Sequence, residues 1–176
     1  SNERRIVFTV ANEEKTKKLI QAQKRHMHIG VPGHGIVIAV PIKSVGGGKT
    51  VAFLNGETDN AAYTPSLNYA HELIVAVCSQ GCTDMVMNAA RAAGARGGTV
   101  LHGKGTGAKG APKFYNITIA QEKEMILIVA ATSQKAAIMQ SILQKAGPDS
   151  KAGTIVFSLP TTQVAGFALL DNQDEA

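Results

Sequence analysis

An internal repeat with a fixed offset of 119 residues constrains this chain more than any other feature. Residues 5–11 read RIVFTVA and residues 124–130 read EMILIVA, the same apolar pattern. The same offset, without a gap, places Pro41 on Pro160 and Gly47 on Gly166. Repetition at a fixed period indicates that one supersecondary unit is used more than once. We therefore expect two copies of one structural pattern.

Each copy reads as strand, helix and strand. In the first copy, the apolar runs at residues 6–10 and 36–40 are predicted strands. In the second copy, residues 117–129 and 154–159 take these places. The pattern is therefore βαβ, present twice.

Each copy contains one predicted helix. Residues 13–26 predict the first helix, with Asn12 as its N-cap and with Leu19 and Ile20 as its apolar stripe. Residues 133–145 predict the corresponding helix of the second copy. Both segments are rich in Lys, Gln and Ala, which suits a helix with one exposed face.

A further βαβ pattern lies between the copies. Residues 72–78 predict a strand, residues 82–93 a helix and residues 97–102 the start of the next strand. Together with the second copy, this gives the order βαββαβ. The predicted fold class is therefore α+β, a ferredoxin-like βαββαβ sandwich, with one complete unit and one half unit.

The half unit creates a physical problem. In a ferredoxin-like sheet the third and fourth strands both pair with the first strand, so a lone back half has unpaired edges. We expect a front βαβ unit that is absent from this sequence, or pairing supplied by another subunit. The expected domains are a back-half unit at residues 1–54, a linker at 55–69, a complete unit at 70–170 and a tail at 171–176.

Composition limits the partners that the chain can have. There are 18 Lys and Arg residues against 13 Asp and Glu, giving a net charge of +5, but aromatic residues make up 5% and Trp is absent. Base-stacking surfaces need aromatic side chains, so we expect no nucleic-acid partner. Apolar runs are far shorter than the roughly 20 residues of a membrane span, which predicts a cytoplasmic protein without one.

Glycine-rich segments offer candidate anion sites. Residues 97–110 read GGTVLHGKGTGAKG and end a predicted strand in a basic turn, where backbone amides and a lysine can bind an anion. A flexible hairpin connection is the alternative reading. Residues 46–50, GGGKT, imitate the end of a Walker loop, but the glycine required five positions earlier is replaced by Lys43. We interpret that segment as a strand-terminating turn.

The remaining candidates for chemistry are histidines and cysteines. His26 and His28 are the only closely spaced histidine pair, and we interpret them as a solvated helix end rather than a metal site. Cys78 ends an apolar strand and is expected to be a buried small hydrophobe. The enzymatic alternative is a small ferredoxin-like enzyme that uses His102 or Cys82.

Three motifs in a fixed order resemble the P-II signal-transduction family of nitrogen regulatory proteins. They are residues 72–107, ELIVAVCSQGCTDMVMNAARAAGARGGTVLHGKGTG, residues 122–129, EKEMILIV, and residues 153–160, GTIVFSLP. Residues 4–48, which include PGHGIVIAVP, are similar to the back half of a second such domain. The resemblance thus covers most of the chain in a tandem form with an incomplete first domain.

The resemblance implies a trimeric regulator rather than an enzyme. Members bind adenine nucleotides or related effectors in clefts between subunits and contact a target protein through a flexible loop between the second and third strands. The expected effector is ATP, ADP or AMP, with no certain cofactor and no metal. The expected effector-binding residues lie at the base of that loop and in the loop before the last strand: Lys104, Gly105, Thr106, Gly107, Lys109, Lys151, Ala152, Gly153 and Thr154.

The chain also departs from the family pattern. The connection at residues 107–116 is shorter than the long target-binding loop of well-known members, so Tyr115 is expected to be structural rather than modified. Residues 164–167, VAGF, lack the arginines that such members direct at nucleotide phosphates. The resemblance therefore implies a different ligand from that of these members, or a weaker one.

Overall fold

The computed structural model describes residues 5–31, 33–43, 64–105, 113–114, 117–118 and 121–166. These residues belong to two compact units. The larger unit is Asn68–Thr161, and the smaller one combines Ser1–Leu67 with Thr162–Ala176. The Walker-like residues 46–50, most of the predicted linker and the tail lie outside the described residues.

The larger unit is built on a four-stranded antiparallel sheet with the strand order β3-β6-β2-β7. The strands are β2 (Asn68–Ser79), β3 (Thr99–Gly105), β6 (Gln121–Ala131) and β7 (Ile155–Thr161). Strand β2 pairs with both β6 and β7, as expected for the first strand of a ferredoxin-like sheet. The order of elements is therefore consistent with the predicted βαββαβ fold.

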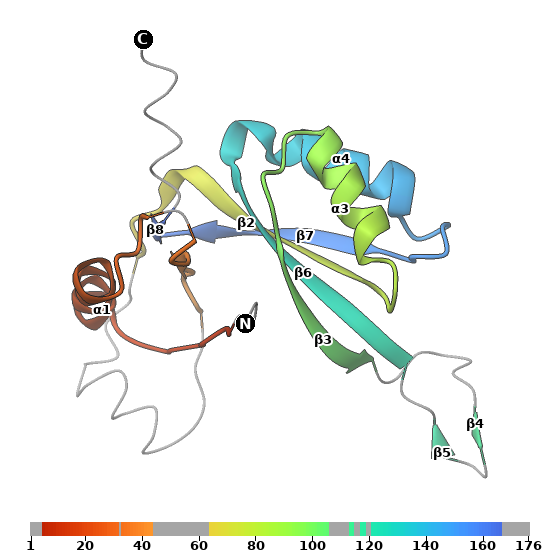
Figure 1. Cartoon of the computed structure of the whole chain (residues 1–176), viewed down its shortest axis with the longest axis horizontal. Coiled ribbons are helices and arrows are strands. Elements are labelled where there is room, and N and C mark those ends of the chain that lie inside the picture. Colours follow the sequence, from red (N-terminus) through yellow and green to blue (C-terminus); the bar gives the residue numbers. More distant parts are fainter. Residues whose placement is uncertain are drawn as a thin grey trace. The chain divides into compact units, whose positions relative to one another are not determined.

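Two helices, α3 (Thr83–Ala92) and α4 (Thr132–Ala146), cover one face of this sheet (Figure 1). Side chains alternate between the faces of a strand, so every second apolar residue meets the helices. The largest fully buried apolar side chains of this core are Ile74, Ile126 and Ile128 from the strands and Val86, Ile138 and Ile142 from the helices.

The face of the sheet away from the helices is also apolar. Met125 on β6 and Ile155 and Phe157 on β7 alternate with the core residues and keep 39%, 57% and 43% of their surface exposed. A sheet that faces water normally carries polar residues on that face. This second apolar face therefore suits burial against another surface.

The loop between β3 and β6 holds a small feature that the sequence did not predict. Strand β4 (Lys113–Phe114) pairs with β5 (Ile117–Thr118) in a separate two-stranded sheet. The predicted strand at residues 117–129 therefore corresponds to β5 and most of β6. Residues 119–120 between them are not described.

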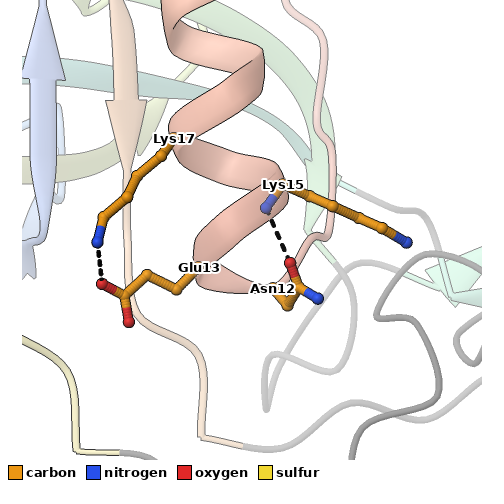
Figure 2. Close-up of polar contacts among 4 residues, drawn as sticks. All are labelled: Asn12, Glu13, Lys15 and Lys17. Atoms are coloured by element: carbon orange, nitrogen blue, oxygen red, sulfur yellow. Dashed lines mark hydrogen bonds and ion pairs between the residues drawn. The ribbon is translucent and has the colours of Figure 1, made fainter.

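The smaller unit contains α1 (Glu13–His26), β1 (Val37–Ala39) and β8 (Gln163–Ala165). The predicted helix is confirmed, and the Asn12 side chain accepts a hydrogen bond from the Lys15 amide at 2.9 Å, as an N-cap does (Figure 2). Strands β1 and β8 pair antiparallel, with Val37 opposite Ala165. The chain thus pairs segments more than 120 residues apart.

The predicted strand at residues 6–10 is wrong, because this described segment has no strand. Val7 and Phe8 are 83% and 79% exposed. A strand needs a neighbour for its backbone groups, and the apolar pattern alone does not supply one. The later strand of the same copy is confirmed only in its centre, as β1.

Among the described helices, none combines the length and apolarity needed to cross a membrane.

Candidate functional site

The two segments predicted to bind an effector meet the same end of the sheet. Lys104 and Gly105 end β3 and pair with the first residues of β6, Glu122 and Gln121. At this end of β2, the Ser79 amide donates to the carbonyl of Ala152 at 2.9 Å. Strands β3 and β7 are the two edges of the sheet, so the segments lie across its width, roughly 14 Å at three strand spacings.

The first of these segments, at the end of β3, carries an exposed charged side chain. The side chain of Lys104 is 69% exposed, and its Nζ lies 3.6 Å from Glu122 Oε1. Gly105 is tightly packed, since a Cβ at this position would be 3.1 Å from Lys123 Cγ. Thr106, Gly107 and Lys109 of the predicted set lie outside the described residues, as does Tyr115.

The second segment, residues 151–154, is a turn whose side chains divide into two kinds. Ala152 and Thr154 are fully buried, whereas Lys151 and Gly153 are exposed. Hydrogen bonds within the turn and to α4 occupy its amides, which donate as follows: Ala152 to Ser150 Oγ, Gly153 to Ser150 O and Thr154 to Ala146 O. Lys151 is therefore the charged group that this turn offers to a ligand, and the buried residues hold its shape.

A third segment, residues 79–83, connects the other two and was not singled out from the sequence. We call it the β2–α3 turn. Its Gln80 amide donates to the carbonyl of Glu122 at 3.3 Å, and Cys82 Sγ lies 3.9 Å from the carbonyl of Lys151. With the Ser79 bond described above, the β2–α3 turn bonds directly to the turn at residues 151–154 and reaches the Lys104 segment through Glu122, its pairing partner on β6.

Glu124 on β6 holds the end of this turn. Its Oε2 accepts hydrogen bonds from the Thr83 amide at 3.1 Å and the Thr83 hydroxyl at 2.5 Å, although only 6% of the residue is exposed. The Thr83 hydroxyl is the main reason that the pKa of Glu124 is lowered, with amide bonds from Gly81 and Thr83 and the nearby His102 assisting against desolvation. Glu124 could have been singled out from the sequence, because it is a charged residue in an apolar strand and alternates with residues that face the helices.

The cysteines and His102 do not form the arrangement that the enzymatic alternative requires. Cys78 is 1% exposed, as predicted for a buried small hydrophobe, and burial raises the pKa of its thiol to about 11. Cys82 is buried against the carbonyl of Lys151. The side chain of His102 is 71% exposed and lies 3.8 Å from Glu124 Oε1. These contacts are structural in character.

The histidines of the smaller unit lie on its surface. His26, His28 and His34 are all exposed, and the rings of His28 and His34 are 6.0 Å apart between centroids. Within the described part of the chain, no three His, Cys, Asp or Glu side chains are grouped as a metal site would require.

Comparison with known families matches the larger unit. A family model described as "Nitrogen regulatory protein P-II" matches residues 71–167, which is more than half of the 176-residue chain. The match begins in β2 and contains both helices and the whole remainder of the four-stranded sheet. No curated protein matches the chain. The chain therefore belongs to the P-II family of nitrogen regulatory proteins, whose members are signalling regulators rather than enzymes.

Proposed function

We propose that this P-II protein binds an adenine nucleotide, ATP, ADP or AMP. Nucleotide binding then regulates a target protein, which contacts the loop that begins at Lys104. The effector site comprises the loop-base residues Lys104, Gly105, Thr106, Gly107 and Lys109 and the turn residues Lys151, Ala152, Gly153 and Thr154. The observation that carries the proposal is that both described parts of this set lie at the same end of the sheet, one at each edge.

The exposed lysines fit an anionic ligand. Lys104 and Lys151 supply positive charge from the two edges of the sheet, which suits the phosphates of a nucleotide. Glu122 is close to Lys104, so an incoming phosphate competes with this carboxylate. That competition favours a ligand of modest affinity.

The position of the lysines also favours a site between subunits. Each lies at an edge of the sheet rather than at its centre, and an edge can meet a neighbouring subunit. The second apolar face, with Met125, Ile155 and Phe157, supplies a surface for association. Closed cyclic assemblies bury such faces around their axis. We propose a homotrimer on these grounds.

The chain is also proposed to be a tandem of P-II units. Helix α1 (Glu13–His26) coincides with the start of α4 (Thr132–Ala146) when 119 residues are added to its first residue. The proposed organisation is a partial unit at residues 1–54, a linker at 55–69, a complete unit at 70–170 and a tail at 171–176. The helix coincidence supports this organisation, and a cytoplasmic location is part of the same proposal.

Isothermal titration calorimetry with ATP, ADP and AMP tests the effector proposal. At least one nucleotide should bind, and Lys104→Ala or Lys151→Ala should weaken it by about tenfold, the loss expected for one charge-assisted contact. Lys145→Ala, which removes an exposed lysine at the end of α4, is the matched control and should leave binding unchanged. Absence of binding by all three nucleotides would reject the proposal.

Sedimentation equilibrium tests the homotrimer. The mass in solution should be three times 18.4 kDa, and Phe157→Glu should lower it, because a carboxylate on the apolar face opposes burial. Asn88→Glu, at an exposed position of α3 on the far side of the sheet, is the control. A monomeric protein at micromolar concentration would contradict the assembly.

A further inference from the structure

The β2–α3 turn is bonded directly to one half of the effector site and, through Glu122 on β6, to the other. On one side, Ser79 and Cys82 contact the carbonyls of Ala152 and Lys151. On the other side, the Gln80 amide contacts the carbonyl of Glu122, whose side chain lies beside Lys104. A displacement of this turn therefore disturbs both halves together.

One buried carboxylate determines where this turn ends. Helix α3 has Cys82 at its N-cap position, and this residue makes no side-chain capping bond. The first amides of a helix have no partner within the helix. Glu124, from a different element, instead accepts bonds from the Thr83 amide and hydroxyl. The capping interaction is thus a tertiary contact, and it fixes the end of the β2–α3 turn to β6.

We propose that Glu124 is a positioning residue of the effector site: its ionised carboxylate holds the β2–α3 turn between the Lys104 end of β3 and the turn at Lys151. This inference rests on the proposed function. Protonation of Glu124 removes its negative charge, and hydrogen bonds to a neutral carboxyl group are weaker than those to a carboxylate. The turn is then less firmly tied to β6, and effector binding weakens.

The groups around Glu124 define the pH range of this effect. His102 faces it from β3 at 3.8 Å, Cys78 lies opposite it on β2, and Glu122 is two residues away on its own strand. Cys78 is a neutral thiol in acid because its pKa is about 11. The pKa of Glu124 lies below its ordinary value of 4.5. The hydrogen bonds from Thr83 to the ionised Glu124 carboxylate are therefore at full strength above about pH 4.5 and weaken as the pH falls further.

Binding of ATP and ADP to matched variants tests the inference. Glu124→Gln keeps the shape of the side chain but removes its charge, and we expect about tenfold weaker binding at pH 7. Glu72→Gln is the control, because Glu72 is also a largely buried carboxylate, paired with Lys135 at 2.7 Å at the opposite end of β2. It should leave nucleotide affinity unchanged even if it lowers stability.

A change at the partner residue separates positioning from general destabilisation. Thr83→Val removes the hydroxyl and should weaken binding in the same direction, whereas Thr83→Ser keeps it and should restore the wild-type affinity. The Glu124→Gln/Thr83→Val double variant should lose little beyond the larger single effect, since both changes act on one contact. Additive losses would contradict a shared role.

The pH profile supplies a second readout. The ratio of wild-type to Glu124→Gln affinity should stay constant from pH 6.5 to about 4.5 and shrink as the pH falls further, with folding monitored by circular dichroism. Equal affinities at pH 7, or a ratio that does not fall below pH 4.5 while the protein remains folded, overturn the inference while leaving the proposed function intact.

If the wild type binds no nucleotide, the proposed function fails and the positioning role is read from the free protein. Glu124→Gln should shift the amide resonances of Ala152 and Gly153, which lie beyond the β2–α3 turn. Unmoved resonances there would overturn the inference independently.

Discussion

Helices α1 and α4 occupy equivalent places in the 119-residue repeat but are stabilised in different ways. Helix α4 buries Ile138, Ile142 and Ala146 completely, and it has neither a side-chain N-cap nor an acidic residue in its first turn. The equivalent residues of the first copy are Leu19 and Gln23 in α1 and Met27 at its C-cap, of which Leu19 and Met27 are 38% and 57% exposed.

One side chain of α1, Ile20, is buried at 5% exposed, and local interactions supplement this packing. Asn12 caps its first turn, and Glu13 pairs with Lys17 one turn later (Figure 2). Glu14 pairs likewise with Lys18, and the basic residues of the helix cluster in its last turn. Such interactions each contribute little, and helix stability in proteins usually comes from an apolar face buried by packing. The comparison shows that one repeated pattern can give a helix with several buried side chains and a helix that buries one and relies more on its own sequence.

Truncation of equivalent apolar residues should give the largest difference between the two helices. Ile138→Ala should lower the free energy of unfolding of the larger unit by about 3 kcal/mol, because it removes a fully buried side chain. Leu19→Ala should cost less than about 1 kcal/mol, because Leu19 is partly exposed in α1. Urea denaturation followed by circular dichroism measures both.

The control for this pair is Leu143→Ala, since Leu143 is on α4 but 45% exposed. It should resemble Leu19→Ala rather than Ile138→Ala. Similar losses for Leu19→Ala and Ile138→Ala would show that α1 is held by packing after all.

Removal of the N-cap should have an intermediate effect that is confined to α1. Asn12→Ala removes the acceptor of the Lys15 amide and should destabilise the first turn by about 1 kcal/mol. Hydrogen exchange at the amides of residues 15–17 should become faster. Asn12→Asp retains an acceptor and should keep protection, whereas unchanged exchange in Asn12→Ala would refute a capped helix.

Acid should produce the smallest of these effects on α1. The hydrogen bond and charge of Lys18 lower the pKa of the exposed Glu14 below its ordinary value of 4.5. A lowered pKa in the folded state means that the contribution is present above pH 4.5 and is lost as the pH falls below it. Amide resonances of residues 14–18 should report a small loss of helix between pH 6 and 3.

Because the pair is exposed, 1 M salt at pH 6 should reproduce part of this loss. Lys18→Gln should reduce the salt sensitivity at the same residues, with the neighbouring Glu13–Lys17 pair accounting for the remainder. A salt response as large in Lys18→Gln as in the wild type would mean that the Glu14–Lys18 pair does not support the helix.

Much of the larger unit was predictable because local signals and burial agree there. The helix and strand order of residues 72–160 followed from apolar runs of the right lengths, and the family resemblance followed from the same residues. The candidate site was only partly predictable. Lys104 and Lys151 could be named, but Glu124 and the β2–α3 turn act through contacts 41 and 69 residues apart in sequence, which no local pattern displays.

The smaller unit shows the opposite case. Residues 6–10 repeat the apolar pattern of β6, yet they form no strand, whereas β1 pairs with β8 across more than 120 residues. An apolar run indicates a preference for burial, but it does not choose the partner that satisfies its backbone.

The amino-acid sequence alone determined the elements with local causes: helix α1 with its Asn12 cap, the alternation of apolar strands and the membership of the P-II family. Tertiary structure decided which of the two helices buries the larger apolar face and which apolar run becomes a strand. It also decided that Glu124 caps a helix from another element. The physical reason is that capping and periodicity act over a few residues, whereas burial and strand pairing depend on neighbours that the folded chain brings together from distant positions.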